Sequence, residues 1–190
     1  LNAAWGFPMV LSFGNLGTGC CGRDDGVAVH GDVNGGKFKW AYGVFEGTTI
    51  ASDGTSGSDQ DDRLRHAGRI DFALGDPEPG FYTGSTYFGA KNLATVGFSF
   101  MAEGDAVGPA TDKGDFLGFA GDFLYERALG NGAVVDFEAA YYDWDLDGKS
   151  GHTGTNTSTL LQGSSYLVLG SYLMPKKISI GGIQGKTQPY

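Results

Sequence analysis

The sequence of 190 residues is long enough for one domain with a sizeable core. Glycine contributes 34 residues and aromatic side chains 13%, while charged residues contribute only 18%, which is typical of chains built from many β-strands. The formal net charge of −9 argues against a nucleic-acid partner, which would need a basic face, so we expect none.

Alternation of apolar and polar side chains with a period of two predicts β-strands along the whole chain. The strong runs cover residues 37–44, 63–74, 94–100, 117–126 and 135–141, and weaker ones cover 5–13, 26–33, 165–174 and 178–184. The strong runs have roughly the ten residues that a tilted strand needs to cross a bilayer. No run of about 18 apolar residues predicts a membrane-spanning helix.

The connections between these runs alternate in length. Short turns are predicted at 34–36, 130–132 and 175–177, and long polar loops at 47–62, 102–115 and 143–163. Short turns on one side and long loops on the other are typical of transmembrane barrels. Segment 75–92 breaks the alternation, and we predict that it is one excursion that does not cross, because its prolines cannot donate to a ladder.

The expected fold class is therefore all-β, an antiparallel transmembrane β-barrel with residues 1–190 as a single, partial barrel domain. About nine crossings are counted, whereas bacterial single-chain barrels close with an even number of strands. The chain also begins without an initiator Met or a signal-peptide pattern. We therefore expect a processed or truncated chain, or a fragment of a larger barrel.

Several sequence runs, in this order and spacing, resemble one known family. They are GRDDGVAVHGD (22–32), GGKF (35–38), YGVFEG (42–47), RHAGRI (65–70), DPEPG (76–80), GNGAV (130–134), EAAYY (138–142) and GKTQPY (185–190). These runs resemble the phosphate-selective porin O/P family of Gram-negative outer membranes over about residues 22–190, whereas residues 1–21 match poorly as an N-terminal strand and loop. The resemblance implies a sixteen-stranded porin, a homotrimer and a water-filled pore in each subunit. Outer-membrane lipid and lipopolysaccharide are then the expected surroundings.

On a barrel wall, the apolar set of side chains faces lipid and the mixed set faces the lumen. The predicted pore-lining residues are Lys39, Arg63, Arg65, Arg69, Asp71, Asp122, Asp136 and Glu138. The predicted lipid-facing residues are Phe38, Trp40, Tyr42, Ile70, Phe72, Val96, Phe98, Phe119, Phe123 and Phe137. Interfacial aromatic girdles are predicted from Trp5, Trp40, Tyr42, Tyr141, Tyr142 and Trp144.

Arginines two residues apart on a strand suggest an anion pathway, because guanidinium groups match phosphate and carboxylate geometry. The family's anion preference rests on such basic ladders. Pairing of these arginines with acidic side chains on neighbouring strands is the favoured alternative. The predicted solutes are therefore small and hydrophilic, ions included, with phosphate and other anions left open.

A calcium-loop opening, DxDxDG, is formed by Asp143, Asp145 and Asp147. Its twelfth position is Gly154 instead of Glu, so an EF-hand is excluded, and solvated carboxylates are favoured over a looser Ca²⁺ site. Adjacent Cys20 and Cys21 show no metal or haem spacing. With no catalytic motif and no cofactor expected, we predict a passive channel and not an enzyme.

Two other classes of function stay open. One is a soluble, secreted β-sandwich or lectin-like binding module with acidic Ca²⁺-binding loops. The other is a barrel subunit that encloses a partner in an outer-membrane complex. A requirement for detergent separates the channel from the soluble module.

Overall fold

The computed structural model describes residues 25–47, 63–78, 86–107, 112–149 and 162–175. It also describes the backbone of four two-residue strands, β7 (Gly151–His152), β8 (Thr159–Leu160), β10 (Ser179–Ile180) and β11 (Ile183–Gln184). The predicted strand 5–13, the segment 1–21 with its cysteines, and Trp5 lie outside the described residues.

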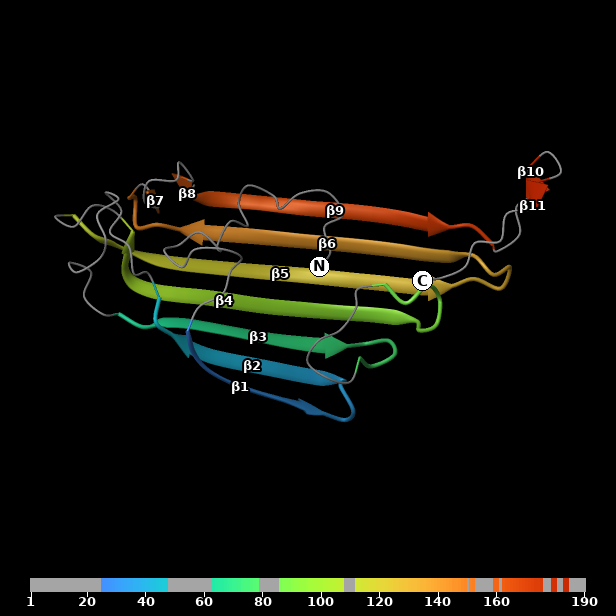
Figure 1. Ribbon diagram of the computed structural model, residues 1–190, viewed down its shortest axis with the longest axis horizontal. Helices are drawn as coiled ribbons and strands as arrows, with labels where there is room; N and C mark the ends of the chain where they lie inside the picture. The colour runs from blue at the N-terminus through green and yellow to red at the C-terminus, as the bar shows by residue number, and fades with distance from the viewer. Residues whose placement is uncertain are drawn as a thin grey trace.

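The main feature is one seven-stranded antiparallel sheet whose strands follow one another in chain order (Figure 1). Its strands are β1 (Gly26–Val33), β2 (Phe38–Phe45), β3 (Arg65–Ala73), β4 (Leu93–Val107), β5 (Gly114–Ala128), β6 (Val134–Asp145) and β9 (Gly163–Leu173). The prediction of an all-β, antiparallel fold is confirmed. The sheet is an open meander with β1 and β9 at its edges, and it is not closed into a barrel.

Successive connections lie at opposite ends of this sheet. Strands β1, β3 and β5 end at one end of the sheet, the turn end (right in Figure 1), and strands β2, β4 and β6 end at the opposite, loop end. The predicted turn at 34–36 is confirmed, and Asn34, Gly35 and Gly36 all have positive φ there, at 54°, 63° and 93°. Strands β3 and β4 pair directly, and the described residues between them form no further strand.

The predicted loop 102–115 is wrong, because strands occupy most of it. Strand β4 continues to Val107 and β5 begins at Gly114, with a register shift between Glu103 and Val107. Asp105 has a φ of 53° inside this irregularity, as β-bulges allow. Gly104 and Asp105 are residue types that are common in loops, but here they are part of a bulged ladder.

The predicted single crossing over 178–184 is also wrong. In this region Ser179–Ile180 pairs with Ile183–Gln184 as two short antiparallel strands, β10 and β11, outside the main sheet. No helix among the described residues is long and apolar enough to span a membrane.

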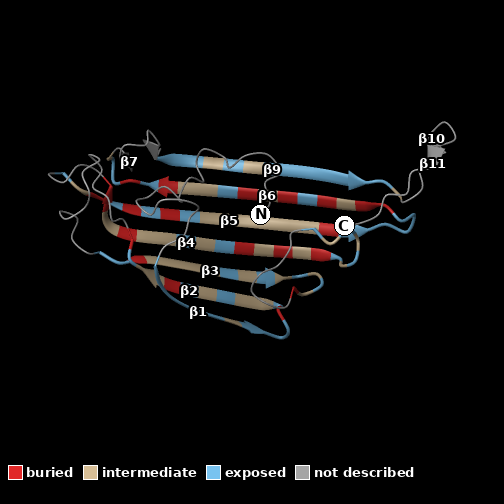
Figure 2. Ribbon diagram, in the orientation of Figure 1, coloured by how far each residue is buried: buried red, intermediate tan, exposed pale blue. Residues whose placement is uncertain are grey.

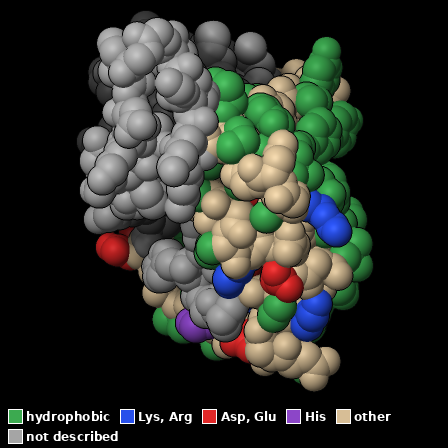
Figure 3. All heavy atoms as spheres, turned by 90° about the vertical axis from the view of Figure 1, so that its right-hand side faces the viewer, with side chains coloured by type: hydrophobic (Ala, Val, Ile, Leu, Met, Phe, Trp, Pro, Cys, Tyr) green, Lys and Arg blue, Asp and Glu red, His purple; other side chains and the backbone are tan. Residues whose placement is uncertain are grey.

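The two faces of the main sheet differ in chemistry. The register places the ten predicted lipid-facing residues, from Phe38 to Phe137, on one face, which we call the apolar face. The opposite, polar face carries charged residues such as Arg69 and Glu138. Figure 3, viewed from the turn end, shows hydrophobic side chains gathered along the right-hand side of the molecule.

Exposure is the reverse of that in a water-soluble sheet. Of the large hydrophobic residues that are exposed within the main strands, all but Leu169 and Leu173 lie on the apolar face. Examples are Phe98 at 52% and Tyr166 at 82% exposure. Five charged residues of the polar face are buried instead: Arg65, Glu103, Glu126, Asp136 and Glu138. Buried positions alternate with intermediate or exposed ones in the first part of β4 and along most of β6 (Figure 2).

A small hydrophobic core lies at the loop end and includes Phe116, Trp144 and Leu146. The rings of Phe116 and Trp144 meet edge to face, with centroids 6.0 Å apart. The prediction that Tyr142 and Trp144 belong to a girdle with Tyr141 is wrong, since both lie on the polar face and Trp144 is only 2% exposed. Adjacent residues of a strand point to opposite faces, so Tyr141 and Tyr142 cannot share one.

Candidate functional site

The polar face gathers most of the predicted pore-lining residues. Seven of the eight lie on it within the strands: Lys39, Arg65, Arg69, Asp71, Asp122, Asp136 and Glu138. The eighth, Arg63, precedes β3 at the loop end, and its side chain is 59% exposed. The sheet therefore brings together, on one surface, charged groups that lie far apart in the sequence.

An ionic network centred on Arg69 occupies the middle of this face. Its guanidinium donates to both carboxylate oxygens of Asp122, at 2.7 and 2.9 Å, and is 2.6 Å from an oxygen of Asp71. Two parallel N–H···O bonds form the strong, geometrically specific arrangement that arginine makes with carboxylates. Burial disfavours an isolated charge, but here two carboxylates surround the cation.

Gly97 makes the bridge between Arg69 and Asp122 sterically possible. It stands on β4 between Asp71 on β3 and Asp122 on β5, directly under the path of the arginine side chain. A Cβ atom at this position would collide with the Nη2 of Arg69 and would lie 2.8 Å from Oδ1 of Asp122. The absence of a side chain therefore allows an ion pair to span three strands.

The other two arginines also have acidic partners. Nε of Arg65 is 2.7 Å from Oε2 of Glu103, and both side chains are almost completely buried. Nε of Arg63 is 3.2 Å from Oδ2 of Asp105. Each arginine of the predicted anion ladder is therefore paired with a carboxylate.

A second group of charges lies toward the turn end, and we call it the acidic cluster: Glu126, Asp136 and Glu138. Glu126 is opposite Asp136 in the register, and Glu138 follows two residues along the same face of β6. All three are buried, with exposures of 0%, 7% and 5%. No lysine or arginine occupies the register positions next to them, since Leu124, Leu169 and Ser171 stand there.

Residues 87–89 of the β3–β4 connection lie over this end of the polar face. The backbone N–H groups of Tyr87 and Gly89 donate to the two carboxylate oxygens of Glu126, each at 2.7 Å. The hydroxyl of Tyr87 donates to Glu78 at 2.7 Å within the same connection. The Glu126 carboxylate, which lies on β5, thus holds the described part of the β3–β4 connection to the sheet.

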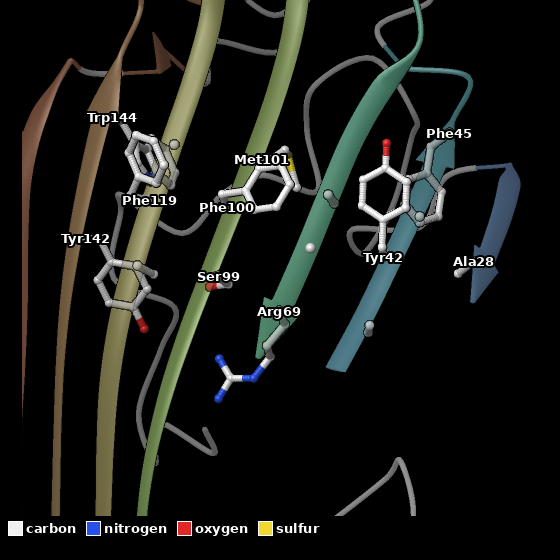
Figure 4. A pocket seen from close by; sticks show the side chains of 16 residues that line it. Ala28, Tyr42, Phe45, Arg69, Ser99, Phe100, Met101, Phe119, Tyr142 and Trp144 are labelled. Carbon is white, nitrogen blue, oxygen red and sulfur yellow. The ribbon is translucent and has the colours of Figure 1, made fainter. Parts of the chain in front are cut away.

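A hollow of about 420 Å³ lies between the ionic network and the core at the loop end. Polar-face residues with small side chains line it: Ala28, Ala41, Gly43, Ala67, Gly118 and Ala120. In Figure 4, Arg69 lies at the lower edge of this group of residues, and Trp144 and Phe45 lie at the upper edge. Small side chains leave this space above the sheet.

Sequence reasoning did not include Thr95, Glu103 and Glu126 among the site residues. Glu103 lay in a stretch predicted to be a loop, and the continued β4 strand places it opposite Phe116 and beside Arg65. Glu126 is an even number of residues from Asp122 on β5, and Thr95 is an even number of residues from Ser99 on β4, so each pair shares a face. Counting by two along each strand would have identified them.

The weak calcium candidate gains no support from the geometry. Asp143 and Asp145 lie on the apolar face of β6, and Asp147 is in the following turn with a φ of 53°. Within the described part of the chain, no three His, Cys, Asp or Glu residues are grouped so that they could hold a metal ion. Asp145 accepts a hydrogen bond from the Asp147 backbone N–H at 2.9 Å, as in an ordinary aspartate-stabilised turn.

Comparisons with known proteins identify no relative. No family model matches the chain, and neither a curated protein nor a solved structure shows significant similarity to it. The resemblance to the phosphate-selective porin O/P family gains no support from these comparisons. The function therefore has to be argued from the two faces of the sheet.

Proposed function

We propose that this sheet is part of the wall of an outer-membrane β-barrel, a passive channel for small hydrophilic solutes and ions, and that the protein is not an enzyme. One observation carries the proposal: the sheet exposes large hydrophobic side chains on one face and buries half of the charged residues of the other. Water disfavours such an apolar surface, and contiguous apolar patches beyond a few hundred Å² are rare on soluble proteins. Hydrocarbon outside and water inside would suit both faces.

The height of the apolar face fits a bilayer. On β3 and its flanks, exposed hydrophobic residues extend from Leu64 to Leu74. These ten steps span roughly 34 Å along a strand. A tilt of about 40° reduces that to about 26 Å, close to the apolar band of about 25 Å on outer-membrane barrels.

The apolar face also has a groove that suits a lipid chain. It has a volume of about 470 Å³, and its lining includes Trp40, Ile70 and Phe98. The ring of Phe100 lies over Gly68, which has no side chain of its own, and forms part of this lining. An acyl chain is a ligand of suitable polarity for such a surface.

The polar face suits passive diffusion of solutes, in which no bond is made or broken. Charged residues brace the wall in pairs, and small side chains leave a hollow beside Arg69. In a channel of this kind, pore width and lumen charge decide which solutes pass. Because Arg63, Arg65 and Arg69 are all paired with carboxylates, we do not extend the proposal to phosphate.

The sequence resemblance supports the compartment and the assembly. A Gram-negative outer membrane, contact with lipopolysaccharide, and a homotrimer are what that resemblance implies. The soluble β-sandwich has less support, because the described residues provide no second sheet of comparable size to cover the apolar face.

Purification with and without detergent, followed by recording in planar bilayers, tests the proposal. We expect detergent dependence, a heat-dependent gel mobility and stepwise conductance. A folded, monodisperse protein in plain buffer that shows no conductance would contradict the proposal and favour the soluble module.

A pair of cysteine variants locates the faces directly. In a background in which Cys20 and Cys21 are replaced by Ser, we compare Phe98→Cys with its neighbour Ser99→Cys. In vesicles, a water-soluble thiol reagent should modify position 99 and spare position 98, because neighbouring residues point to opposite faces. Equal labelling would contradict a wall between lipid and water.

A further inference from the structure

The strands of the described sheet carry an unequal charge balance on their polar face. The basic residues are Lys39, Arg65 and Arg69. The acidic residues are Asp32, Asp71, Glu103, Asp122, Glu126, Asp136 and Glu138. If this face lines water, its fixed charge is negative.

The positive charges of the arginines are already compensated. Arg69 is bound by both Asp71 and Asp122, and Arg65 by Glu103. An anion that approached either guanidinium would have to displace a carboxylate already in place. The arginines therefore contribute little attraction for anions.

The negative charges at the turn end are compensated only in part. Glu126 receives two backbone N–H groups. Oδ2 of Asp136 and Oε2 of Glu138 are buried and accept no hydrogen bond from the described part of the chain. A buried carboxylate oxygen that lacks a donor is unfavourable unless a cation or water supplies the missing interaction.

A neutral side chain that also lacks a hydrogen-bond partner in the described part of the chain lies on the same face. The hydroxyl of Thr95 is buried, the residue being 8% exposed, and it has no partner in the described part of the chain. The register aligns Thr95 with Glu138, with Leu124 between them. Hydroxyl and carboxylate oxygens are ligands that small hard cations prefer.

We propose that the acidic cluster, with Thr95 across Leu124 on the same face, makes this channel prefer small inorganic cations over anions, and that Asp136 and Glu138 provide most of the preference. This inference rests on the proposed channel function. Unpaired acidic side chains along a pore raise the local cation concentration and select cations. The cation passes as a mobile, hydrated ion, since no three groups converge on a fixed metal position in the described residues.

The test is the reversal potential of the purified protein in a planar bilayer under a KCl gradient. We expect the sign of a K⁺ preference for the native protein. The double variant Asp136→Asn with Glu138→Gln should lower the K⁺ to Cl⁻ permeability ratio at least about threefold. The single variants should each give part of that change.

The same strand offers a matched control. Asp143→Asn with Asp145→Asn removes two charges with the same spacing on β6, but from the apolar face. This control should keep the native permeability ratio, and the heat-dependent gel mobility of every variant reports that it is folded.

Three outcomes would overturn the inference. They are a native preference for Cl⁻, a double variant that behaves like the native protein, and an equal shift in the control. In all three the protein still conducts, so the channel function itself stands. A folded protein without any conductance would remove the proposed function and this inference with it.

Discussion

Replacing Phe98 by arginine distinguishes a membrane wall from a soluble sheet by its effect on stability. Phe98 lies on the apolar face of β4, next to Ile70 in the register, and is 52% exposed. Half of an aromatic side chain of about 200 Å² is roughly 100 Å², which contributes about 2.5 kcal/mol when it lies in hydrocarbon. An arginine near the midplane costs about 2–4 kcal/mol more. Phe98→Arg should therefore lower the free energy of unfolding in lipid by about 4.5–6.5 kcal/mol.

Guanidinium-induced unfolding in lipid vesicles measures this difference, with Leu124→Arg as the control. Leu124 lies on the polar face between Thr95 and Glu138, so an arginine there meets a carboxylate. We expect the control to cost about 1 kcal/mol or less, as for an accommodated surface substitution. A soluble sheet would tolerate Phe98→Arg within about 0.5 kcal/mol, and that result would refute the membrane argument.

Three further substitutions test individual contacts. Gly97→Val should separate Arg69 from Asp122 and lower the free energy of unfolding by about 1–3 kcal/mol, measured by denaturant titration; an unchanged midpoint would contradict the close approach. Trp144→Ala should lower it by about 3–5 kcal/mol, because the ring is almost fully buried; thermal unfolding checks this. Glu126→Ala should leave two backbone donors without their acceptor and make the β3–β4 connection more sensitive to protease than in the native protein.

The faces of the sheet could be predicted from the sequence because they depend only on local alternation. Phe98 and Ser99 must point to opposite sides of any strand that contains them. The predicted strand bounds were wrong where the alternation of apolar and polar residues is interrupted. The bulge near Asp105 joins two parts of β4 that look like strand and loop in the sequence, and its ladder to β5 is visible only in three dimensions.

The partners of individual charged side chains could not be predicted to the same extent as the faces of the sheet. Which carboxylate meets Arg69 depends on the register of three strands, and that register depends on turn geometry. Glu126 is a stronger example, because its donors are backbone groups of residues 37 and 39 positions earlier in the chain. Side-chain type alone gives no indication of such a contact.

The edge strands β1 and β9 impose the strictest condition on the membrane proposal. In the described sheet, each has a neighbour on one side only. An unpaired backbone N–H or C=O group in hydrocarbon costs several kcal/mol, so eight residues of β1 cannot stay unpaired there. The proposal therefore requires further strands, from elsewhere in the protein or from another copy, to pair with both edges.

Amide hydrogen exchange in lipid vesicles tests this condition strand by strand. If both edges are paired, the amides of β1 and β9 should exchange as slowly as those of β4 at the centre of the sheet. If the edges are open, every second amide of β1 and β9 should exchange orders of magnitude faster than those of β4, since alternate residues of an antiparallel edge direct their N–H outward. Fast exchange at both edges in a protein that remains inserted would contradict a closed wall. It would favour a sheet whose apolar face lies against another protein, where backbone groups at its margins can reach water.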